Sequence, residues 1–309
     1  MKLHWKGVMP AVTTKFTDDD QLDLKAFEKN IAAQLEAGVT GIILGGTLGE
    51  ASTLNSEEKE RLIDATLKMV KGKVPVIINI AEQSTEDAIS VAKRAEKIGA
   101  NGLMLLPPMR YKATDRETVE YFKEIARSTS LPIMIYNNPV DYKIEVTIEM
   151  FEELLAKCDN IEAVKESTRD ISNITRLKNN FGDRIKILCG VDTLALESMV
   201  AGADGWVAGL VAAYPAETVA IYELVKAEKI KEALEIYRWF MPLLELDISP
   251  QLVQNIKLAE VATGLGTENV RPPRLPLEGL ERERVLAIIN DAMQNRPTLP
   301  DYKNLSLQQ

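Results

Sequence analysis

Residues 98–106 read Ile98-Gly99-Ala100-Asn101-Gly102-Leu103-Met104-Leu105-Leu106, which is a helix end, a turn and a short apolar run in succession. The first glycine is typical of the left-handed residue that ends a helix, and the second opens the apolar run. The phrase returns with variation as Ala37-Gly38-Val39-Thr40-Gly41 and as Ala201-Gly202-Ala203-Asp204-Gly205. Its recurrence indicates that one helix–strand unit is used many times along the chain.

Short apolar runs of this kind are expected to be strands, and they alternate with longer segments of helical period. There are eight of them, at residues 8–13, 41–45, 74–80, 102–106, 132–136, 161–165, 185–189 and 205–208. Continuous apolar strands are buried on both faces, as in a parallel sheet wrapped by helices. Eight such units predict an α/β protein with a closed (β/α)8 barrel, and an open doubly wound sheet is the alternative. No G-x-G-x-x-G follows the first run, which counts against a dinucleotide-binding fold.

Helix boundaries are marked as well. Asn55, Ser84 and Thr114 each precede acidic residues, as capping residues do at a helix start. After residue 226 only helical patterns remain, at 231–246, 250–263 and 280–294, with a proline-rich loop between the last two. We therefore expect a barrel over residues 1–226 and a helical extension over residues 227–309 that packs on it and could contact another subunit.

The composition excludes several classes of function. With 37 Lys+Arg against 46 Asp+Glu the net charge is −9, which argues against a nucleic-acid partner. The one histidine, His4, makes histidine catalysis or a histidine-rich metal site improbable. Cys158 and Cys189 form no CxxC and are expected to be reduced residues of a cytoplasmic protein. No signal peptide or membrane span is expected, because no apolar stretch approaches the roughly 20 residues that a span needs.

Active sites of such barrels form where the strands end. The second run leads into the glycine-rich turn Gly45-Gly46-Thr47-Leu48-Gly49-Glu50. Its backbone N–H groups could receive a carboxylate or a phosphate, although the turn lacks the lysine of a nucleotide-binding P-loop. The alternative is a tight connection with no ligand.

Lys165 closes the sixth run, where a lysine with apolar neighbours points into the mouth of a barrel. Desolvation lowers the pKa of an amine, and a neutral amine can attack a carbonyl to form a Schiff base. The alternative is a lysine that extends to solvent. Lys15, beyond the first run, is a competitor, but the acidic residues 18–20 that follow suggest that it is solvated.

The remaining strand ends offer polar or small residues. Tyr136, before Asn137-Asn138-Pro139, could relay a proton or could be a packed aromatic. Gly190 would let a substrate approach the backbone, and Val207 on the eighth run completes the predicted pocket. For Asp192 a helix cap is the expected role.

These motifs resemble a known family. Gly46-Thr47-Leu48-Gly49-Glu50, Tyr136-Asn137-Asn138-Pro139 and Val164-Lys165-Glu166 are similar to the ordered signatures of the dihydrodipicolinate synthase/N-acetylneuraminate lyase family, with similarity from Gly7 to roughly Leu280. The resemblance implies a (β/α)8 barrel with C-terminal helices, a homotetramer or homodimer, and no metal or organic cofactor.

The resemblance also implies roles for individual residues. Lys165 would form the Schiff base with a small 2-oxo acid, Tyr136 would shuttle the proton and Thr47 would orient Tyr136. The turn that contains Gly46, Leu48 and Gly49 would hold the substrate carboxylate.

Three positions depart from the synthase pattern. Leu48 replaces a second threonine, Arg110 replaces a tyrosine supplied to a neighbouring subunit, and Asp141 replaces an arginine that binds the carboxylate of the aldehyde substrate. An acid at that position would repel a carboxylate. The departures therefore predict that the condensation of lysine biosynthesis is disfavoured.

The chain resembles instead the 1-pyrroline-4-hydroxy-2-carboxylate deaminases, on the segments 106–112, 238–244 and 257–277. This resemblance implies conversion of a cyclic 2-imino acid to 2-oxoglutarate semialdehyde and ammonia through Lys165, with Asp141 and Arg110 near the substrate. The alternatives are 4-hydroxy-tetrahydrodipicolinate synthase or another pyruvate-dependent aldolase and, more remotely, a non-catalytic binding barrel.

Overall fold

The computed structural model describes residues 3–307 and contains a ring of eight parallel strands. The strands are β1 (Gly7–Pro10), β2 (Ile42–Leu44), β3 (Val76–Ile80), β4 (Gly102–Leu105), β5 (Ile133–Asn137), β6 (Ile161–Glu166), β7 (Lys186–Cys189) and β8 (Gly205–Ala208). Their order is β1-β8-β7-β6-β5-β4-β3-β2, and a parallel bridge from Ala11 to Ile43 joins the two ends. The predicted (β/α)8 barrel is confirmed.

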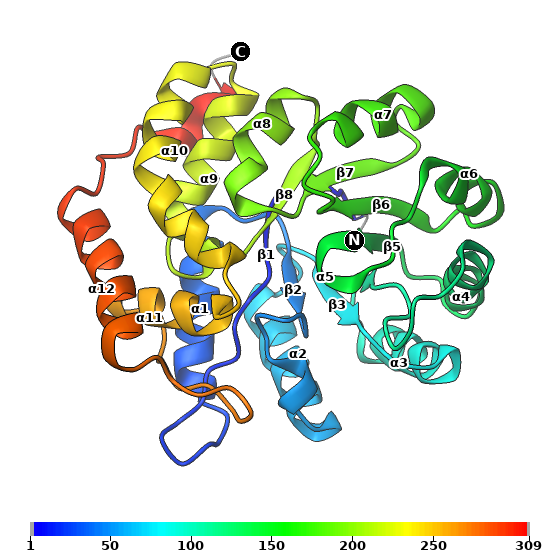
Figure 1. Cartoon of the computed structure of the whole chain (residues 1–309), viewed down its shortest axis with the longest axis horizontal. Helices are drawn as coiled ribbons and strands as arrows, with labels where there is room; N and C mark the ends of the chain where they lie inside the picture. The colour runs from blue at the N-terminus through cyan, green and yellow to red at the C-terminus, as the bar shows by residue number, and fades with distance from the viewer. Residues whose placement is uncertain (1–2, 308–309) are drawn as a thin grey trace.

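Helices surround the strands (Figure 1). They are α1 (Leu24–Ala37), α2 (Ser56–Val70), α3 (Thr85–Ile98), α4 (Asp115–Arg127), the short α5 (Pro139–Tyr142), α6 (Ile148–Lys157), α7 (Ser172–Phe181), α8 (Ala195–Val200) and α9 (Pro215–Lys226). The predicted N-caps are confirmed: Asn55 and Thr114 form capping boxes, and Ser84 accepts a hydrogen bond from the Asp87 N–H. Gly38 and Gly99 end α1 and α3 in the left-handed conformation.

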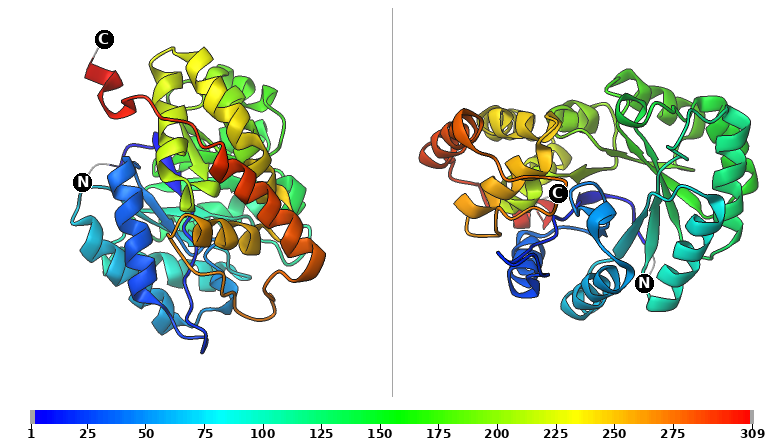
Figure 2. Two further views of the ribbon diagram at one scale, coloured as in Figure 1. Left: turned by 90° about the vertical axis from the view of Figure 1, so that its left-hand side faces the viewer. Right: turned by 60° about the horizontal axis from the view of Figure 1, so that its bottom comes forward.

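The chain then continues in three further helices, the first of which packs against α9. They are α10 (Ile230–Leu244), α11 (Leu252–Ala262) and α12 (Gly279–Gln294), with the short 3-10 helix η4 (Glu245–Ile248) between α10 and α11. Figure 2 shows this extension along one side of the barrel. The division into a barrel over 1–226 and an extension over 227–309 falls between α9 and α10 and stays a prediction. In residues 3–307 no helix is long and apolar enough to cross a membrane.

Two buried ion pairs connect the extension to the barrel. Glu260 of α11 lies 2.7 Å from Lys15 Nζ, and Lys257 of the same helix pairs with Glu50, which follows β2. All four side chains are fully buried. Removing one partner of such a pair leaves an uncompensated charge and typically costs about 3–5 kcal/mol. These contacts therefore hold α11 against the ends of the first two strands.

Candidate active site

Two of the predicted residues lie side by side at the ends of neighbouring strands. Tyr136 on β5 and Lys165 on β6 are partners in the parallel register, so their side chains leave the sheet on the same side. The Nζ atom of Lys165 lies 4.0 Å from the centroid of the Tyr136 ring. The structure thus brings together the lysine and the tyrosine that sequence reasoning selected.

The Lys165 amine is buried and uncommitted. The residue is 8% exposed, and within residues 3–307 its amine has no hydrogen bond or ion pair. Burial lowers the pKa of Lys165, while the charges of Tyr142, Asp247 and Asp192 act in the opposite direction. A lowered pKa increases the fraction of neutral amine, which is the form that attacks a carbonyl.

Gly190, after β7, supplies the space that Lys165 occupies. A Cβ atom at this position would lie 2.6 Å from both Cγ and Cε of Lys165 and would also collide with Ser167 Oγ. These distances are shorter than any ordinary carbon–carbon contact. The role found for Gly190 is therefore close packing against the lysine.

Gly190→Ala is expected to reduce the rate of Schiff-base formation at Lys165 by about 10- to 100-fold, since overpacking of this kind costs about 1–3 kcal/mol. Trapping with cyanoborohydride and a 2-oxo acid, followed by intact mass, measures the rate. Thermal unfolding of the same variant separates a displaced lysine from a loss of fold. A normal trapping rate in a folded variant would mean that the reactivity of Lys165 does not depend on the space left by Gly190.

The Tyr136 hydroxyl is held by an amide. It accepts a hydrogen bond of 3.1 Å from Asn138 Nδ2, which also donates to the Asp141 carboxylate at 2.7 Å. Burial raises the pKa of Tyr136 to about 12. The phenol therefore keeps its proton at neutral pH and can donate it to a reacting group.

The Thr47 hydroxyl meets a second tyrosine in the structure. It lies 3.2 Å from the hydroxyl of Tyr142, and the hydrogen bond found for the Tyr136 hydroxyl is to Asn138. This contact arises because α5 turns Tyr142 back over the mouth, edge-on to Tyr136 with 5.6 Å between ring centroids. Tyr142 thus lies against both Thr47 and Tyr136, and the role of Thr47 in orienting Tyr136 stays a prediction.

The glycine-rich turn has free space beside Gly46, and at its end Glu50 is held by side-chain contacts. A Cβ on Gly46 would meet nothing within 4 Å, whereas one on Gly49 would lie 3.3 Å from the Val12 carbonyl oxygen. Leu48 is buried in the hydrophobic core and offers no polar group. Glu50 is held by Lys257 and by the Arg271 N–H, 3.0 Å away. The C-terminal extension therefore positions the turn that is predicted to receive the substrate carboxylate.

Two predicted residues lie apart from this cluster. Arg110 is exposed in the loop between β4 and α4, and the structure of residues 3–307 gives it no hydrogen bond or ion pair. Val207 is buried within β8, in register with Met9 of β1. Neither contributes a polar contact to the Lys165–Tyr136 pair.

Lys15 and Asp192 differ from expectation. Lys15, predicted to be solvated, is 1% exposed and paired with Glu260, because α11 covers it. Asp192 does not cap its own helix: its carboxylate accepts hydrogen bonds from Trp206 Nε1 (2.9 Å) and from the N–H groups of Gly209 and Leu210. It thereby holds the loop after β8, which sequence spacing does not reveal.

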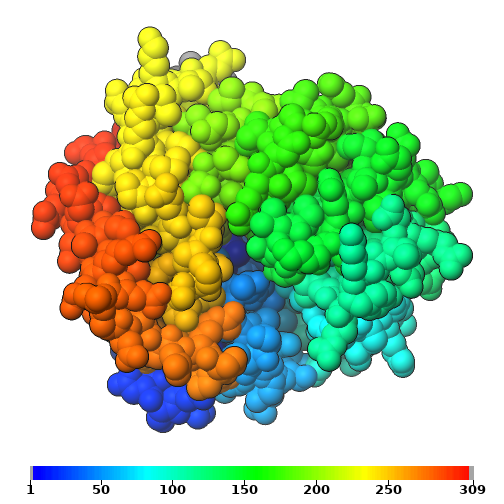
Figure 3. Space-filling model, in the orientation of Figure 1, coloured from blue at the N-terminus to red at the C-terminus, as the bar shows by residue number. Residues whose placement is uncertain are grey.

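Sequence reasoning missed Asp247, which lies on η4. A Cβ on Gly209 would lie 2.6 Å from Asp247 Oδ1, so the carboxylate sits directly against the end of β8. No local pattern marks this residue, because the helix that carries it reaches the barrel mouth only after α9 and α10. The space-filling view shows a hollow between the green residues around α5 and the gold residues of the extension (Figure 3).

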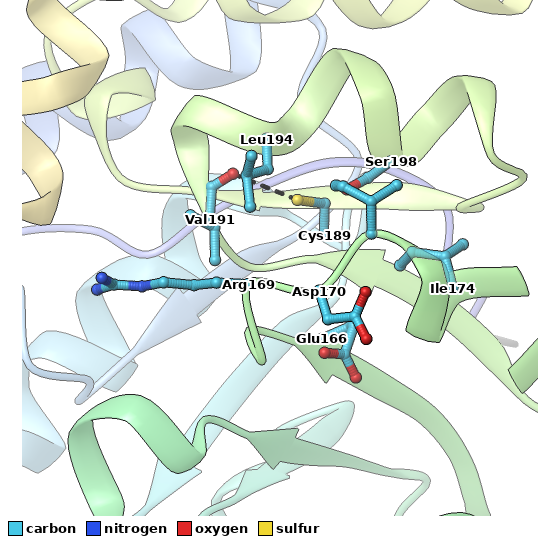
Figure 4. Close-up of a pocket in the computed structure, with 9 residues that line it drawn as sticks. Glu166, Arg169, Asp170, Ile174, Cys189, Val191, Leu194 and Ser198 are labelled. Carbon is cyan, nitrogen blue, oxygen red and sulfur yellow. Dashed lines mark hydrogen bonds between the residues drawn. The ribbon is translucent and has the colours of Figure 1, made fainter. Parts of the chain in front are cut away.

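A small cavity borders Glu166, the residue after Lys165. Glu166 accepts hydrogen bonds from Asn173 (2.9 Å) and the Thr168 N–H (2.8 Å), and burial raises its pKa. The adjoining cavity, between Glu166, Cys189 and Ser198, has a volume of about 10 Å³ (Figure 4). That is room for about one water molecule, not for a substrate.

Comparison with known proteins agrees with this geometry. The model of the dihydrodipicolinate synthetase family matches residues 4–292. The 4-hydroxy-tetrahydrodipicolinate synthase of Exiguobacterium sibiricum is 35% identical over 276 residues, which are 88% of this chain and 92% of that protein. The enzyme of the same name from Thermotoga neapolitana is 30% identical over 93% of this chain and 99% of that protein.

Solved structures give the same result. Dihydrodipicolinate synthase from Thermotoga maritima superposes with a TM-score of 0.87 at 29% identity, over 94% of this chain and 98% of that one. The Bacillus anthracis enzyme gives 0.89 at 28% identity, over 96% of this chain and all of that one (100%). The chain therefore belongs to the dihydrodipicolinate synthetase family, and it is an enzyme of the lysine Schiff-base lyase and aldolase type.

Proposed function

We propose that Lys165 forms a Schiff base with a small 2-oxo acid. The observation that carries this proposal is the buried Lys165 amine, which has no hydrogen bond or ion pair within residues 3–307 and lies against the Tyr136 ring. Burial also lowers its pKa. The 2-oxo acid carboxylate would bind at the backbone of the turn that includes Gly46 and Gly49.

The chemistry follows from these groups. The neutral amine attacks C2, and the resulting carbinolamine loses its hydroxyl as water to give the protonated imine. That imine acidifies the protons on C3, so that a proton relay centred on Tyr136 can move a proton between C3 and the second reactant. No step requires histidine.

The first candidate for the complete reaction is the condensation of pyruvate with aspartate semialdehyde. It is supported by the names of the relatives, which are 4-hydroxy-tetrahydrodipicolinate synthases at 30–35% identity. In this reaction the enamine of pyruvate attacks the aldehyde carbon. Sequence analysis ranked this activity second, and the comparisons favour it over the deaminase.

The second candidate is deamination of 1-pyrroline-4-hydroxy-2-carboxylate, and Asp141 supports it. Asp141 is exposed, and its carboxylate accepts a hydrogen bond from Asn138. At this position the synthase pattern has an arginine that binds a carboxylate. Lys165 would open the ring at C2, loss of the C3 proton would expel the C4 hydroxyl, and hydrolysis at C2 and C5 would release ammonia.

Parallel assays of the purified enzyme separate the two reactions. We expect condensation of pyruvate with aspartate semialdehyde, measured by loss of the aldehyde, to exceed ammonia release from 1-pyrroline-4-hydroxy-2-carboxylate. Ammonia release without condensation would assign the deaminase. Asp141→Ala is expected to lower ammonia release from 1-pyrroline-4-hydroxy-2-carboxylate by about 10-fold, the cost of one charge-assisted hydrogen bond. Unchanged turnover would remove Asp141 from the substrate site.

The assembly is also a proposal. The family resemblance implies a homotetramer or homodimer, in which Arg110 could reach a neighbouring subunit. Sedimentation velocity of the purified chain measures the assembly, and a monomer would contradict the proposal.

A further inference from the structure

Asp247 brings an uncommitted carboxylate to the mouth of the barrel. Its Oδ1 atom is placed 2.6 Å from where a Gly209 Cβ would be, so only a glycine there leaves room for it. Across residues 3–307 the Asp247 side chain takes part in no hydrogen bond or ion pair. Asp192, the neighbouring acid, is by contrast fully engaged with Trp206, Gly209 and Leu210.

More acidic than basic side chains lie around the mouth of the barrel. Asp141 and Asp192 are both close enough to Asp247 to interact with it electrostatically. Asp192 and Asp247 also interact with one amine, that of Lys165. Burial and the charge of Asp192 raise the pKa of Asp247 well above its usual range. A cation bound beside Asp247 would stabilise its ionised form against this burial and repulsion, so the position favours a positively charged group on the substrate.

An acidic cluster alone would not identify a ligand, but a second observation points to one. Ser167 Oγ is buried beside Lys165 and has no hydrogen-bond partner within residues 3–307. The Lys165 amine is likewise unpaired in a residue that is 8% exposed. The polar groups around Lys165 are therefore arranged for a molecule that binds there.

We propose that Asp247 binds an ammonium group of the substrate, at the end remote from the 2-oxo carbon. This inference rests on the Schiff base proposed at Lys165 and specifies the substrate class of that site. Both candidate reactions provide such a group. Aspartate semialdehyde carries an α-ammonium, and a 1-pyrroline-2-carboxylate carries one at C5 after ring opening.

The ring-opening step balances without an additional reagent. The neutral Lys165 amine attacks C2 of the protonated cyclic imine, and a new C2–Nζ bond replaces the bond from C2 to the ring nitrogen. The positive charge stays on the new imine, the ring nitrogen leaves as a neutral amine, and it takes one proton from water. The resulting ammonium then pairs with the Asp247 carboxylate.

The test compares two acids that differ in this group. Wild-type enzyme and Asp247→Asn are incubated with 1-pyrroline-2-carboxylate, which yields a C5 ammonium and lacks the hydroxyl needed for elimination, or with 2-oxopentanoate, which has the same carbon chain and no nitrogen. Reduction with cyanoborohydride and intact mass give the fraction of Lys165 modified at each concentration. Glu245→Gln, an exposed acid on the same 3-10 helix, is the matched control.

In Asp247→Asn we expect the half-saturating concentration of 1-pyrroline-2-carboxylate to rise about 10- to 100-fold, with that of 2-oxopentanoate unchanged, as for loss of a charge-assisted hydrogen bond. Glu245→Gln should leave both unchanged. Equal losses for both acids would mean that Asp247 stabilises the imine itself and would overturn the inference, as would no change for either.

Two further outcomes are distinguishable. No adduct with either acid in the wild-type enzyme would overturn the proposed Schiff base and, with it, the ammonium site. If Asp247→Asn fails to fold, Asp247→Ser is measured in its place, and its unchanged 2-oxopentanoate adduct verifies the fold.

The two sources of the ammonium are then separated by condensation rates with aspartate semialdehyde and with succinate semialdehyde, which lacks the nitrogen. A selective loss with the former in Asp247→Asn identifies the amino aldehyde.

Discussion

Lys165→Arg is expected to lower kcat by about 10⁶-fold, the scale observed when a covalent nucleophile is removed. Arginine keeps the positive charge and much of the side-chain volume, but its guanidinium stays protonated and cannot form the imine. Cyanoborohydride trapping with pyruvate should add mass to the wild-type enzyme and none to the variant. The observation behind this expectation is that the buried Lys165 amine has no hydrogen bond or ion pair in the part of the chain that the structure describes, and that burial lowers its pKa.

The matched control is Lys186→Arg, at the opposite end of the barrel on β7, where the lysine pairs with Asp183 at the surface. It should trap pyruvate as the wild-type enzyme does. An adduct that persists in Lys165→Arg would place the nucleophile elsewhere, and Lys15 would then be the residue to test. We expect no adduct there, because Lys15 is buried against Glu260.

The lowered pKa of Lys165 also determines how the rate of Schiff-base trapping depends on pH. Only the neutral amine attacks, so the trapping rate rises with pH and levels off above the pKa of Lys165. Since burial lowers that pKa, the plateau is expected below the ordinary lysine value of about 10.4.

Tyr136→Phe is expected to lower kcat by about 10²- to 10⁴-fold, the usual contribution of a positioned proton-transfer group. The substitution keeps the ring that lies under Lys165 Nζ and removes the hydroxyl that accepts from Asn138. The Schiff base should therefore still form, while the proton transfers that follow become slow. Steady-state kinetics together with the trapping rate resolve these steps.

Tyr214→Phe serves as the control for the tyrosine. Burial also raises the pKa of Tyr214 to about 12, but its ring packs against Trp239 and Phe240 of α10 and not against Lys165. Its kcat should match that of the wild-type enzyme. A Tyr136→Phe enzyme with unchanged kcat would transfer the proton role to Tyr142, whose hydroxyl lies 3.2 Å from Thr47 Oγ1.

Much of the fold was predictable because its signals are local. A strand buried on both faces must be apolar throughout, so each of the eight strands appears as a run in the sequence, with ends that shift by at most a few residues. Caps such as Asn55 and Thr114 act within three residues of themselves, and they were found where the sequence indicated. Lys165 and Tyr136 were accessible to the same reasoning, since each lies at the end of its strand.

What the sequence did not reveal concerns partners that are distant along the chain. Lys15 looked solvated because its neighbours are acidic, yet Glu260, 245 residues away, makes it a core residue. The family resemblance implies that Thr47 orients Tyr136, and it gave no sign of the Tyr142 hydroxyl, which α5 places 3.2 Å from Thr47. Local spacing carries no information about either contact.

The sequence by itself determined the barrel, the order of its strands, and the tyrosine and lysine at the ends of β5 and β6. Each of these follows from the local pattern of apolar residues and from the position of a residue within its own strand. Only the tertiary structure decided what surrounds them. The extension folds back so that Lys257 holds the turn after β2 and Asp247 lies against Gly209. The physical reason is that electrostatic interactions depend on distance in space and not on distance along the chain. Asp247 of η4 comes long after Glu166, the last residue of β6, and yet lies at the same end of the barrel.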